Sequence, residues 1–175
     1  DHSAHATLSV PVHAVADQPS GNGSGSGNED TWIAVPITVA PTDTDGSEML
    51  EYVEITGVPA TASVRWQNGD GSTNTSGTGT VDPLTGVIRI TGTTAEIEAR
   101  VQALQILTAS NTDDDFTLSV KVGSIESNPT ESGDIALLRN DFTFAVPVAV
   151  LPIADAATVS GSSVVVEDHT VVFGA

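Results

Sequence analysis

Apolar side chains alternate with polar ones along several segments, and this alternation constrains the fold more than any other feature. A period of two places every second side chain on one face of an extended strand, so each segment predicts a half-buried β-strand. The alternating apolar residues are Ile33, Val35, Ile37 and Val39; Ala62, Val64 and Trp66; Phe116, Leu118, Val120 and Val122; and Phe142, Phe144, Val146 and Val148. Turn sequences at 68–71 and 82–86 separate such segments, as in antiparallel sandwiches. We therefore predict an all-β fold, an antiparallel β-sandwich.

One segment departs from the alternation and predicts a short helix. Thr93 can serve as the N-cap, and Glu96, three residues later, completes a capping box. Ile97, Val101 and Leu104 then follow at helical spacing. We expect this helix to cross one end of the sandwich.

The two ends of the chain carry similar sequences, which indicates an internal repeat. The dipeptides and tripeptides Val-Pro-Val, Ala-Asp and Glu-Asp occur in this order at residues 10–12, 16–17 and 29–30, and again at residues 146–148, 154–155 and 167–168. We predict one complete module at 16–153, the last strand of a preceding module at 1–15, and the start of the next module at 154–175. Neighbouring modules of the same chain are then the expected partners.

A tract of glycine and serine at 21–27 has the composition of a flexible linker. Its counterpart in the second copy contains Val164, Val165 and Val166, which suit an edge strand. The two copies therefore differ at this place.

The charge of the chain excludes several classes of partner. Five Lys and Arg residues stand against 23 Asp and Glu residues, which gives a net charge of −18. Such a surface repels nucleic-acid phosphates and anionic lipid head groups, and no apolar run approaches the roughly 20 residues that span a bilayer. We expect neither nucleic-acid binding nor membrane insertion. The lack of cysteine also excludes disulfides and thiolate chemistry.

Acidic residues gather at turns in three clusters that are candidates to meet at one pole of the sandwich. The clusters are Glu29 with Asp30; Asp43, Asp45 and Glu48; and Asp113, Asp114 and Asp115. Two carboxylates about 5 Å apart repel by roughly 3 kcal/mol at an effective dielectric constant near 20. Because basic residues are few, the expected counter-charge is a metal ion, and hard oxygen donors favour calcium.

Each of these residues also has a plain structural interpretation. Asp and Gly are ordinary turn formers, and an acidic surface keeps a protein in solution. Asp17 and Asp155 stand where one module passes into the next, as ligands of an inter-module calcium or as solvated linker residues. The histidines lack metal-ligand spacing and are expected to be exposed: His2, His5, His13 and His169.

No catalytic motif occurs in the sequence. The nucleophile elbow, the dinucleotide-binding glycine motif and the phosphate-binding loop are all missing. Trp66 and Tyr52 lie in strand patterns, where packing is the expected role. We therefore expect a protein that is not an enzyme.

Two longer stretches carry a family resemblance. Residues 111–118 (Asn-Thr-Asp-Asp-Asp-Phe-Thr-Leu) and 146–155 (Val-Pro-Val-Ala-Val-Leu-Pro-Ile-Ala-Asp) resemble the tandem immunoglobulin-like or cadherin-like repeats of giant bacterial repeats-in-toxin (RTX) adhesins. Residues 28–31 and 43–48 match the same pattern. The resemblance covers essentially the whole module, and it departs at the Gly/Ser tract and at the long polar loop 68–80.

The resemblance implies an immunoglobulin-like sandwich that is secreted and displayed on a bacterial cell surface. There it would be a monomeric, calcium-stabilised extender in an adhesin that promotes biofilm formation, while other domains contact host or biofilm ligands. The implied calcium ligands are Glu29, Asp30, Asp43, Asp45, Glu48, Asp113 and Asp115. The alternative is a module that itself binds sugar or peptide, for which only Trp32 and Trp66 offer large aromatic platforms.

Overall fold

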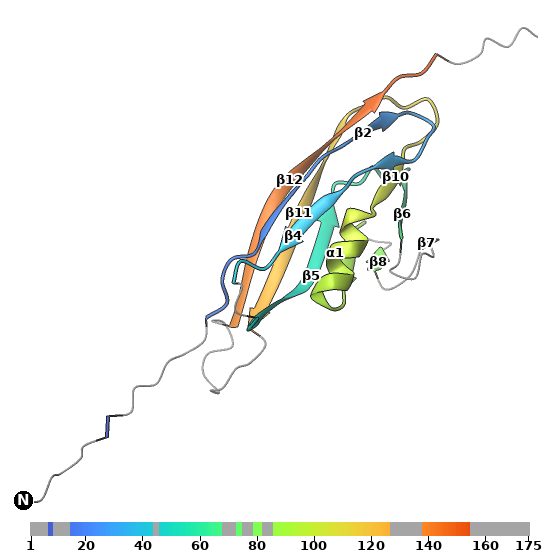
Figure 1. The fold of residues 1–175 in the computed structure, drawn as a ribbon. Helices are drawn as coiled ribbons and strands as arrows, with labels where there is room; N and C mark the ends of the chain where they lie inside the picture. Colours follow the sequence, from blue (N-terminus) through green and yellow to red (C-terminus); the bar gives the residue numbers. More distant parts are fainter. Residues whose placement is uncertain are drawn as a thin grey trace, which may run out of the picture.

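The structure is a computed structural model that describes residues 7–8, 15–43, 46–67, 73–74, 79–81, 86–126 and 138–154. Strands dominate the described residues, and one short helix accompanies them (Figure 1). The predicted all-β class is therefore confirmed.

Six of the strands form one sheet. In spatial order they are β2 (Gly25–Asn28), β12 (Arg139–Leu151), β11 (Phe116–Glu126), β5 (Glu48–Thr56), β9 (Ile88–Thr91) and β8 (Gly79–Val81). Neighbouring strands run antiparallel, except that β2 runs parallel to β12. The longest strands, β11 and β12, pair with each other, and β11 and β5 are the two central strands of this layer.

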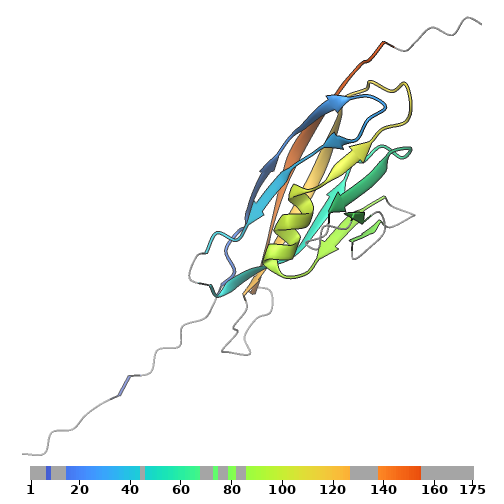
Figure 2. The ribbon, with the colours of Figure 1, turned by 45° about the vertical axis from the view of Figure 1, so that its right-hand side comes forward.

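The other strands lie over one face of the six-stranded sheet (Figures 1 and 2). Four of them form a sheet in the order β3 (Ile33–Ala34), β10 (Gln105–Leu107), β6 (Ser63–Gln67) and β7 (Thr73–Asn74). The remaining two, β1 (Ser20–Gly23) and β4 (Ile37–Ala40), pair with each other. The fold is thus sandwich-like, with two layers of strands.

The core lies between the layers and is built mainly from aliphatic side chains. Alternation is visible along β4, where Ile37 and Val39 are buried and Thr38 is exposed. The fully buried side chains of largest volume include Trp66, Ile33, Leu50, Ile55, Ile90, Ile106 and Leu118. Burying one such side chain contributes about 1.5–3 kcal/mol relative to leaving it in water.

The predicted helix is confirmed, including its capping box. Helix α1 (Thr94–Gln102) begins after Thr93, whose Oγ1 accepts a hydrogen bond from the Glu96 amide at 3.3 Å. The Glu96 carboxylate accepts in return from the Thr93 amide at 2.8 Å. Ile97 and Val101 are buried on its inner face. No helix in the described part of the chain has the length and apolar character needed to cross a bilayer.

The Gly/Ser tract forms two consecutive strands, so the linker prediction is wrong. β1 pairs antiparallel with β4, and β2 pairs parallel with β12. Glycines occupy alternate positions of this tract and are half-buried, whereas the residues between them are exposed. Composition indicated flexibility, but the period of two in the glycines is a strand signal, because glycine in a strand marks close approach of other groups.

The described chain enters the fold at one end and leaves it at the opposite end (Figure 1). At the first end, Asn140 Nδ2 donates to the Ala16 carbonyl at 3.2 Å, and Ser124 Oγ donates to the Asp17 carbonyl at 2.8 Å. We call this end, which includes Asp17, the N-terminal pole. The end where β12 finishes at Leu151 is the C-terminal pole.

Candidate functional site

Two buried glutamates are paired at the N-terminal pole. Glu48 begins β5, Glu126 ends β11, and the two residues lie directly opposite each other in the antiparallel register. Their exposed fractions are only 8% and 7%. The Glu48 Oε2 atom accepts a weak hydrogen bond from the Asp43 amide at 3.4 Å, while its Oε1 atom is buried and has no hydrogen-bond partner among the residues that the structure describes. Like charges directly opposite in a sheet destabilise it, so a cation bound here would relieve both defects.

Other predicted ligands flank this pair to different degrees. Asp43 is half-buried and is tied to Glu48 through its amide. Asp17 is exposed, and its contact with the sheet is made by its backbone carbonyl, which accepts a hydrogen bond from Ser124 Oγ. Asp45 lies outside the described residues. Sequence reasoning missed Glu126, because its only signal is the strand register that sets it opposite Glu48.

At the C-terminal pole, Glu29 fixes the departing chain. Its amide donates to the Leu151 carbonyl at 2.9 Å, and its Oε1 accepts from the Ile153 amide at 2.7 Å. Glu29 is only 7% exposed. Asp115 acts in the same way on β12 itself, since its Oδ1 accepts from the amide of Val150, near the end of the strand, at 2.8 Å. These two carboxylates therefore hold the last part of β12 in place.

The loop of Asp30 closes the same pole. Its Oδ1 accepts from the Asn111 amide at 3.2 Å, and both residues have positive φ, 58° and 55°. This left-handed conformation is uncommon outside glycine but tolerated by Asp and Asn. Asp113 and Asp114, next to this contact in the chain, are exposed. Asp155 lies outside the described residues.

The acidic clusters do not meet at one pole, which corrects that expectation. Two of them, at Glu29 and at Asp113, lie at the C-terminal pole, because the loops before β3 and before β11 belong to the same end of the sheets. The cluster at Glu48 lies at the N-terminal pole, where β5 begins and β11 ends. Within the described residues, no three Asp, Glu or His side chains are gathered closely enough to hold a metal as they stand. The four histidines lie outside the described residues.

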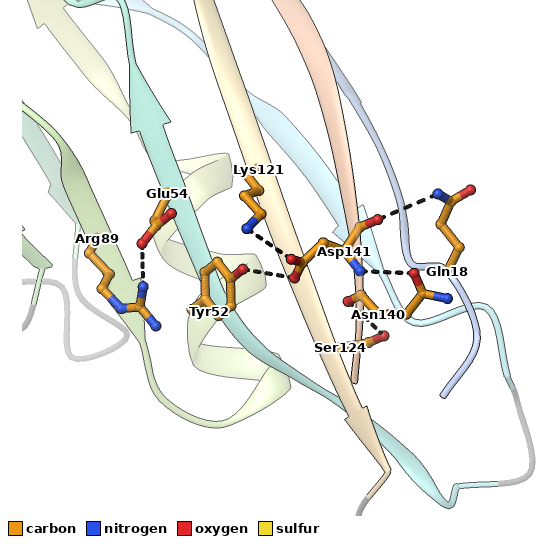
Figure 3. A network of polar contacts seen from close by, with 8 residues as sticks. All are labelled: Gln18, Tyr52, Glu54, Arg89, Lys121, Ser124, Asn140 and Asp141. Carbon is orange, nitrogen blue, oxygen red and sulfur yellow. Dashed lines mark hydrogen bonds and ion pairs between the residues drawn. The ribbon is translucent and has the colours of Figure 1, made fainter. Parts of the chain in front are cut away.

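A polar network covers the outer face of the six-stranded sheet (Figure 3). It contains three of the chain's five basic residues, each paired with an acid: Arg89 with Glu54, Lys121 with Asp141 at 2.8 Å, and Arg139 with Glu51 at 2.6 Å. Cross-strand register explains the first pair, because Glu54 lies directly opposite Arg89. Lys121 and Asp141 lie diagonally across β11 and β12, since Lys121 is opposite Thr143 and Asp141 is opposite Gly123. These residues surround a groove of about 520 Å³.

Tyr52 stands in the middle of this network. Its hydroxyl donates to Asp141 Oδ1 at 2.7 Å, and its ring lies opposite Gly123, where a Cβ would come within 2.4 Å of Tyr52 Cε1. The Arg89 guanidinium lies 4.2 Å from the ring centroid. The ring thus packs on the sheet and is covered by a cation, in agreement with the predicted packing role. The network was missed because outward strand positions carry no motif.

Ionisation in the network is coupled through hydrogen bonds. Burial raises the pKa of Tyr52 above its ordinary value. Burial would also raise the pKa of Asp141, but hydrogen bonds from Lys121 and Tyr52 and the nearby positive charges outweigh it and lower that pKa. The hydrogen bond to Asp141 raises the pKa of Lys121. The raised pKa of Lys121 and the lowered pKa of Asp141 therefore keep this pair charged at neutral pH, while the raised pKa of Tyr52 keeps its hydroxyl neutral.

An apolar groove of about 410 Å³ lies next to Trp32, and residues of both layers line it, among them Val64 of β6 and Ile88 of β9. Val58 and Pro59 also line it, and the Arg65 guanidinium lies 4.1 Å from the centroid of the Trp32 ring. Trp66 is only 1% exposed and belongs to the core. Of the two tryptophans considered as sugar platforms, only Trp32 can contact a ligand.

No protein-family model matches the chain, and neither a curated protein nor a solved structure is similar enough to reveal a relative. The geometry described above therefore carries the functional argument.

Proposed function

We propose that this chain is a non-enzymatic, calcium-stabilised extender module of a large bacterial cell-surface adhesin. The observation that carries the proposal is the buried pair of Glu48 and Glu126, in which Glu48 Oε1 has no hydrogen-bond partner within the described part of the chain. A buried acceptor without a donor costs about 1–3 kcal/mol, and more when it is charged. A bound cation would offset this cost, because it would interact favourably with both carboxylates.

Calcium suits the available donors better than other cations. Carboxylate and backbone carbonyl oxygens, without any cysteine, select hard ions, and calcium accepts the irregular geometry of loop ligands. At the N-terminal pole, Glu48 and Glu126 would hold the ion together with Asp43 and Asp45 from the adjoining loop. Asp17, the predicted inter-module ligand, lies at the same pole, where its backbone carbonyl accepts a hydrogen bond from Ser124.

The C-terminal pole offers a second set of donors. Glu29, Asp30 and Asp115 each accept a backbone amide with one carboxylate oxygen, and a cation would bind the other oxygen of each. Asp113 and, from the linker, Asp155 would complete the set. A cation here would bind next to the point where the chain leaves the module.

The path of the chain supports a role as a spacer. Because the described chain enters and leaves at opposite ends (Figure 1), modules joined in series would extend a line rather than fold back. Large apolar side chains are exposed at both junctions: Val15 at 57%, Leu151 at 48% and Ile153 at 43%. These side chains are suited to contact a neighbouring module of the same chain. The proposed boundaries are 1–15, 16–153 and 154–175.

The strand arrangement supports an immunoglobulin-like sandwich. Such sandwiches pack two mainly antiparallel sheets over a shared core. Here the continuous segment 20–28, which we call the first strand, divides between the layers: its β1 half pairs with β4 in one layer, and its β2 half pairs with β12 in the other. The resemblance of residues 111–118 and 146–155 to RTX adhesin repeats supports a secreted module on a bacterial surface that contributes to biofilm formation.

The second candidate is a ligand-binding module, and the groove beside Trp32 favours it. This groove is apolar, partly open and bordered by an aromatic ring, features that suit a sugar face or an apolar peptide side chain. Arg65 covers part of the ring, so a ligand would have to displace the guanidinium or bind beside it.

Thermal unfolding with calcium and with a chelator tests the leading proposal. Sites of extracellular type bind with dissociation constants of about 10⁻⁴ to 10⁻³ M, and a concentration of 100 times that value stabilises by about 2.7 kcal/mol. We expect a higher melting temperature in millimolar calcium than in chelator. Equal melting temperatures would contradict the proposal.

Glu48→Gln separates a bound cation from a general effect of salt. In chelator the variant should be more stable than the wild type, because the repulsion between Glu48 and Glu126 is gone, and its response to calcium should be reduced. Glu98→Gln is the matched control. Glu98 lies on α1, so this substitution should leave the calcium response intact. A glycan and peptide screen in calcium tests the second candidate, and specific binding lost in Trp32→Ala would establish it.

A further inference from the structure

The first strand, residues 20–28, turns its glycines toward the rest of the sandwich, where little room is left for a side chain. An ideal Cβ would lie 2.3 Å from Phe144 Cε1 at Gly21, 2.9 Å from the Pro36 carbonyl oxygen at Gly23, 2.8 Å from Val35 Cγ2 at Gly25, and 3.1 Å from Ile33 Cγ1 at Gly27. None of these four glycines has a positive φ. Space, and not backbone conformation, therefore disfavours a side chain at these positions, strongly at Gly21, Gly23 and Gly25 and less strongly at Gly27.

The groups that exclude a side chain come from both layers of the fold. Ile33, Val35 and the Pro36 carbonyl belong to the chain of β3 and β4, and Phe144 belongs to β12. Ile33 and Val35 are buried in the core at 1% and 0% exposure. The strand thus occupies a narrow slot whose walls cannot retreat without disturbing the core.

The second copy of this sequence would not fit the same slot. Aligning Asp17 with Asp155 and Glu29 with Glu167 places four residues at the inward positions in turn: Val159, Gly161, Ser163 and Val165. Glycine is kept only opposite Gly23, where the nearest atom is a backbone oxygen. At the other three positions the second copy carries a Cβ. It would overlap Phe144 at Gly21 and Val35 at Gly25, and at Gly27 it would crowd Ile33 and require that side chain to shift.

We propose that the inward glycines make the slot selective for the module's own first strand and exclude the corresponding strand of the next repeat. Exchange of identical elements between repeats is a characteristic failure of tandem arrays. The edge strand is the easiest element to exchange, because it pairs by backbone hydrogen bonds that any sequence can form. Steric selection at Gly21, Gly25 and Gly27 would prevent that error. The inference rests on the proposed tandem organisation, but it does not involve calcium.

Exchanging inward and outward residues separately in the full chain tests the proposal. The inward variant carries Gly21→Val, Gly25→Ser and Gly27→Val, and the outward control carries Asn22→Ser and Ser26→Val, all taken from the second copy. Overpacking by added methyl groups should lower the folding equilibrium constant of the inward variant by about tenfold or more. The control should stay within about threefold of the wild type. An inward variant as stable as the wild type, in urea titrations with and without calcium, would overturn the proposal.

A milder pair of variants keeps the test informative if the triple variant does not fold. Gly27→Val alone should be destabilising, and adding Ile33→Val, the residue that the second copy has at the aligned position (Val171), should restore part of the loss. Synthetic peptides then test selectivity directly on whichever glycine variant folds. A peptide of residues 18–30 should raise its melting temperature, whereas one of residues 156–168 should not. Equal rescue by both peptides, or no coupling between positions 27 and 33, would refute the selection mechanism.

Discussion

Asparagine in place of Asp141 removes one negative charge from the outer-face network and leaves its shape nearly unchanged. Asp141 accepts a hydrogen bond from the Tyr52 hydroxyl at 2.7 Å and forms an ion pair with Lys121 at 2.8 Å. In the variant, the amide oxygen can still accept from Tyr52, but the ion pair is lost. The stability change therefore reports the charge of Asp141 more than its volume.

The expected magnitude is modest because the pair is partly exposed. The side chains of Lys121 and Asp141 are 41% and 45% accessible, and ion pairs at such positions contribute about 0–1 kcal/mol. The hydrogen bond from Tyr52 weakens when its acceptor becomes neutral, which adds up to about 1 kcal/mol. We expect Asp141→Asn to lower the free energy of unfolding by about 1 kcal/mol at neutral pH.

The pH dependence of this difference has a definite sign. The pKa of Asp141 is lowered in the fold, so its contribution is present above the unfolded value of about 4 and is lost as the pH falls through the lower folded value. The difference between wild type and variant should shrink below about pH 4. On the alkaline side, the raised pKa values of Lys121 and Tyr52 predict a loss of stability as the pH rises above about 10.

Urea titrations at pH 7 and pH 3 measure the effect, with Asp114→Asn as the control. Asp114 is an exposed carboxyl on a loop and should show little change at either pH. A variant difference that is the same at both pH values would refute the electrostatic explanation. A control with the same profile as Asp141→Asn would show that net charge, and not the network, causes the change.

Two further predictions concern the helix and the array. Thr93→Ala removes the side-chain half of the capping box and should destabilise the fold by about 1 kcal/mol in urea titration, whereas Thr93→Ser should not; equal losses would contradict the cap. In a chain of two or more repeats, small-angle scattering should show longer and more uniform particles in calcium than in chelator, because ions at the junctions would restrict rotation that small interfaces otherwise allow. Coinciding distributions with folded modules would remove the stiff-spacer role.

The sequence predicted those parts of the fold whose signal is periodic. Ile37 and Val39 alternate with exposed residues in β4, and the capping box at Thr93 places the helix correctly. The strand of residues 20–28 was missed, because its inward positions carry no side chain and hydrophobic alternation cannot detect it. The same tract shows period two once glycine is counted as an inward residue.

The candidate sites were harder to predict because they depend on strand register. Clusters of acidic residues in loops indicated where negative charge lies in the sequence. They did not show that the loop before β5 and the loop before β11 lie at opposite poles, which follows from the antiparallel pairing of these two strands. Glu126 joins Glu48 only through pairing across strands, and the ion pairs of Lys121 and Arg89 arise in the same way. Residues far apart in sequence therefore form the sites, and no local motif encodes them.

The two poles would respond differently to the loss of an ion. At the N-terminal pole, Glu48 and Glu126 belong to the strands of one sheet, so a cation there would stabilise the module itself. At the C-terminal pole, Glu29 and Asp115 bind the amides of Ile153 and Val150, and the same side chains would both hold the ion and direct the departing chain. Removing calcium from this second pole would change the direction of the next module even where the sandwich stays folded. With calcium at both poles as proposed, stability and stiffness would be separable properties of one module, each associated with its own pair of carboxylates.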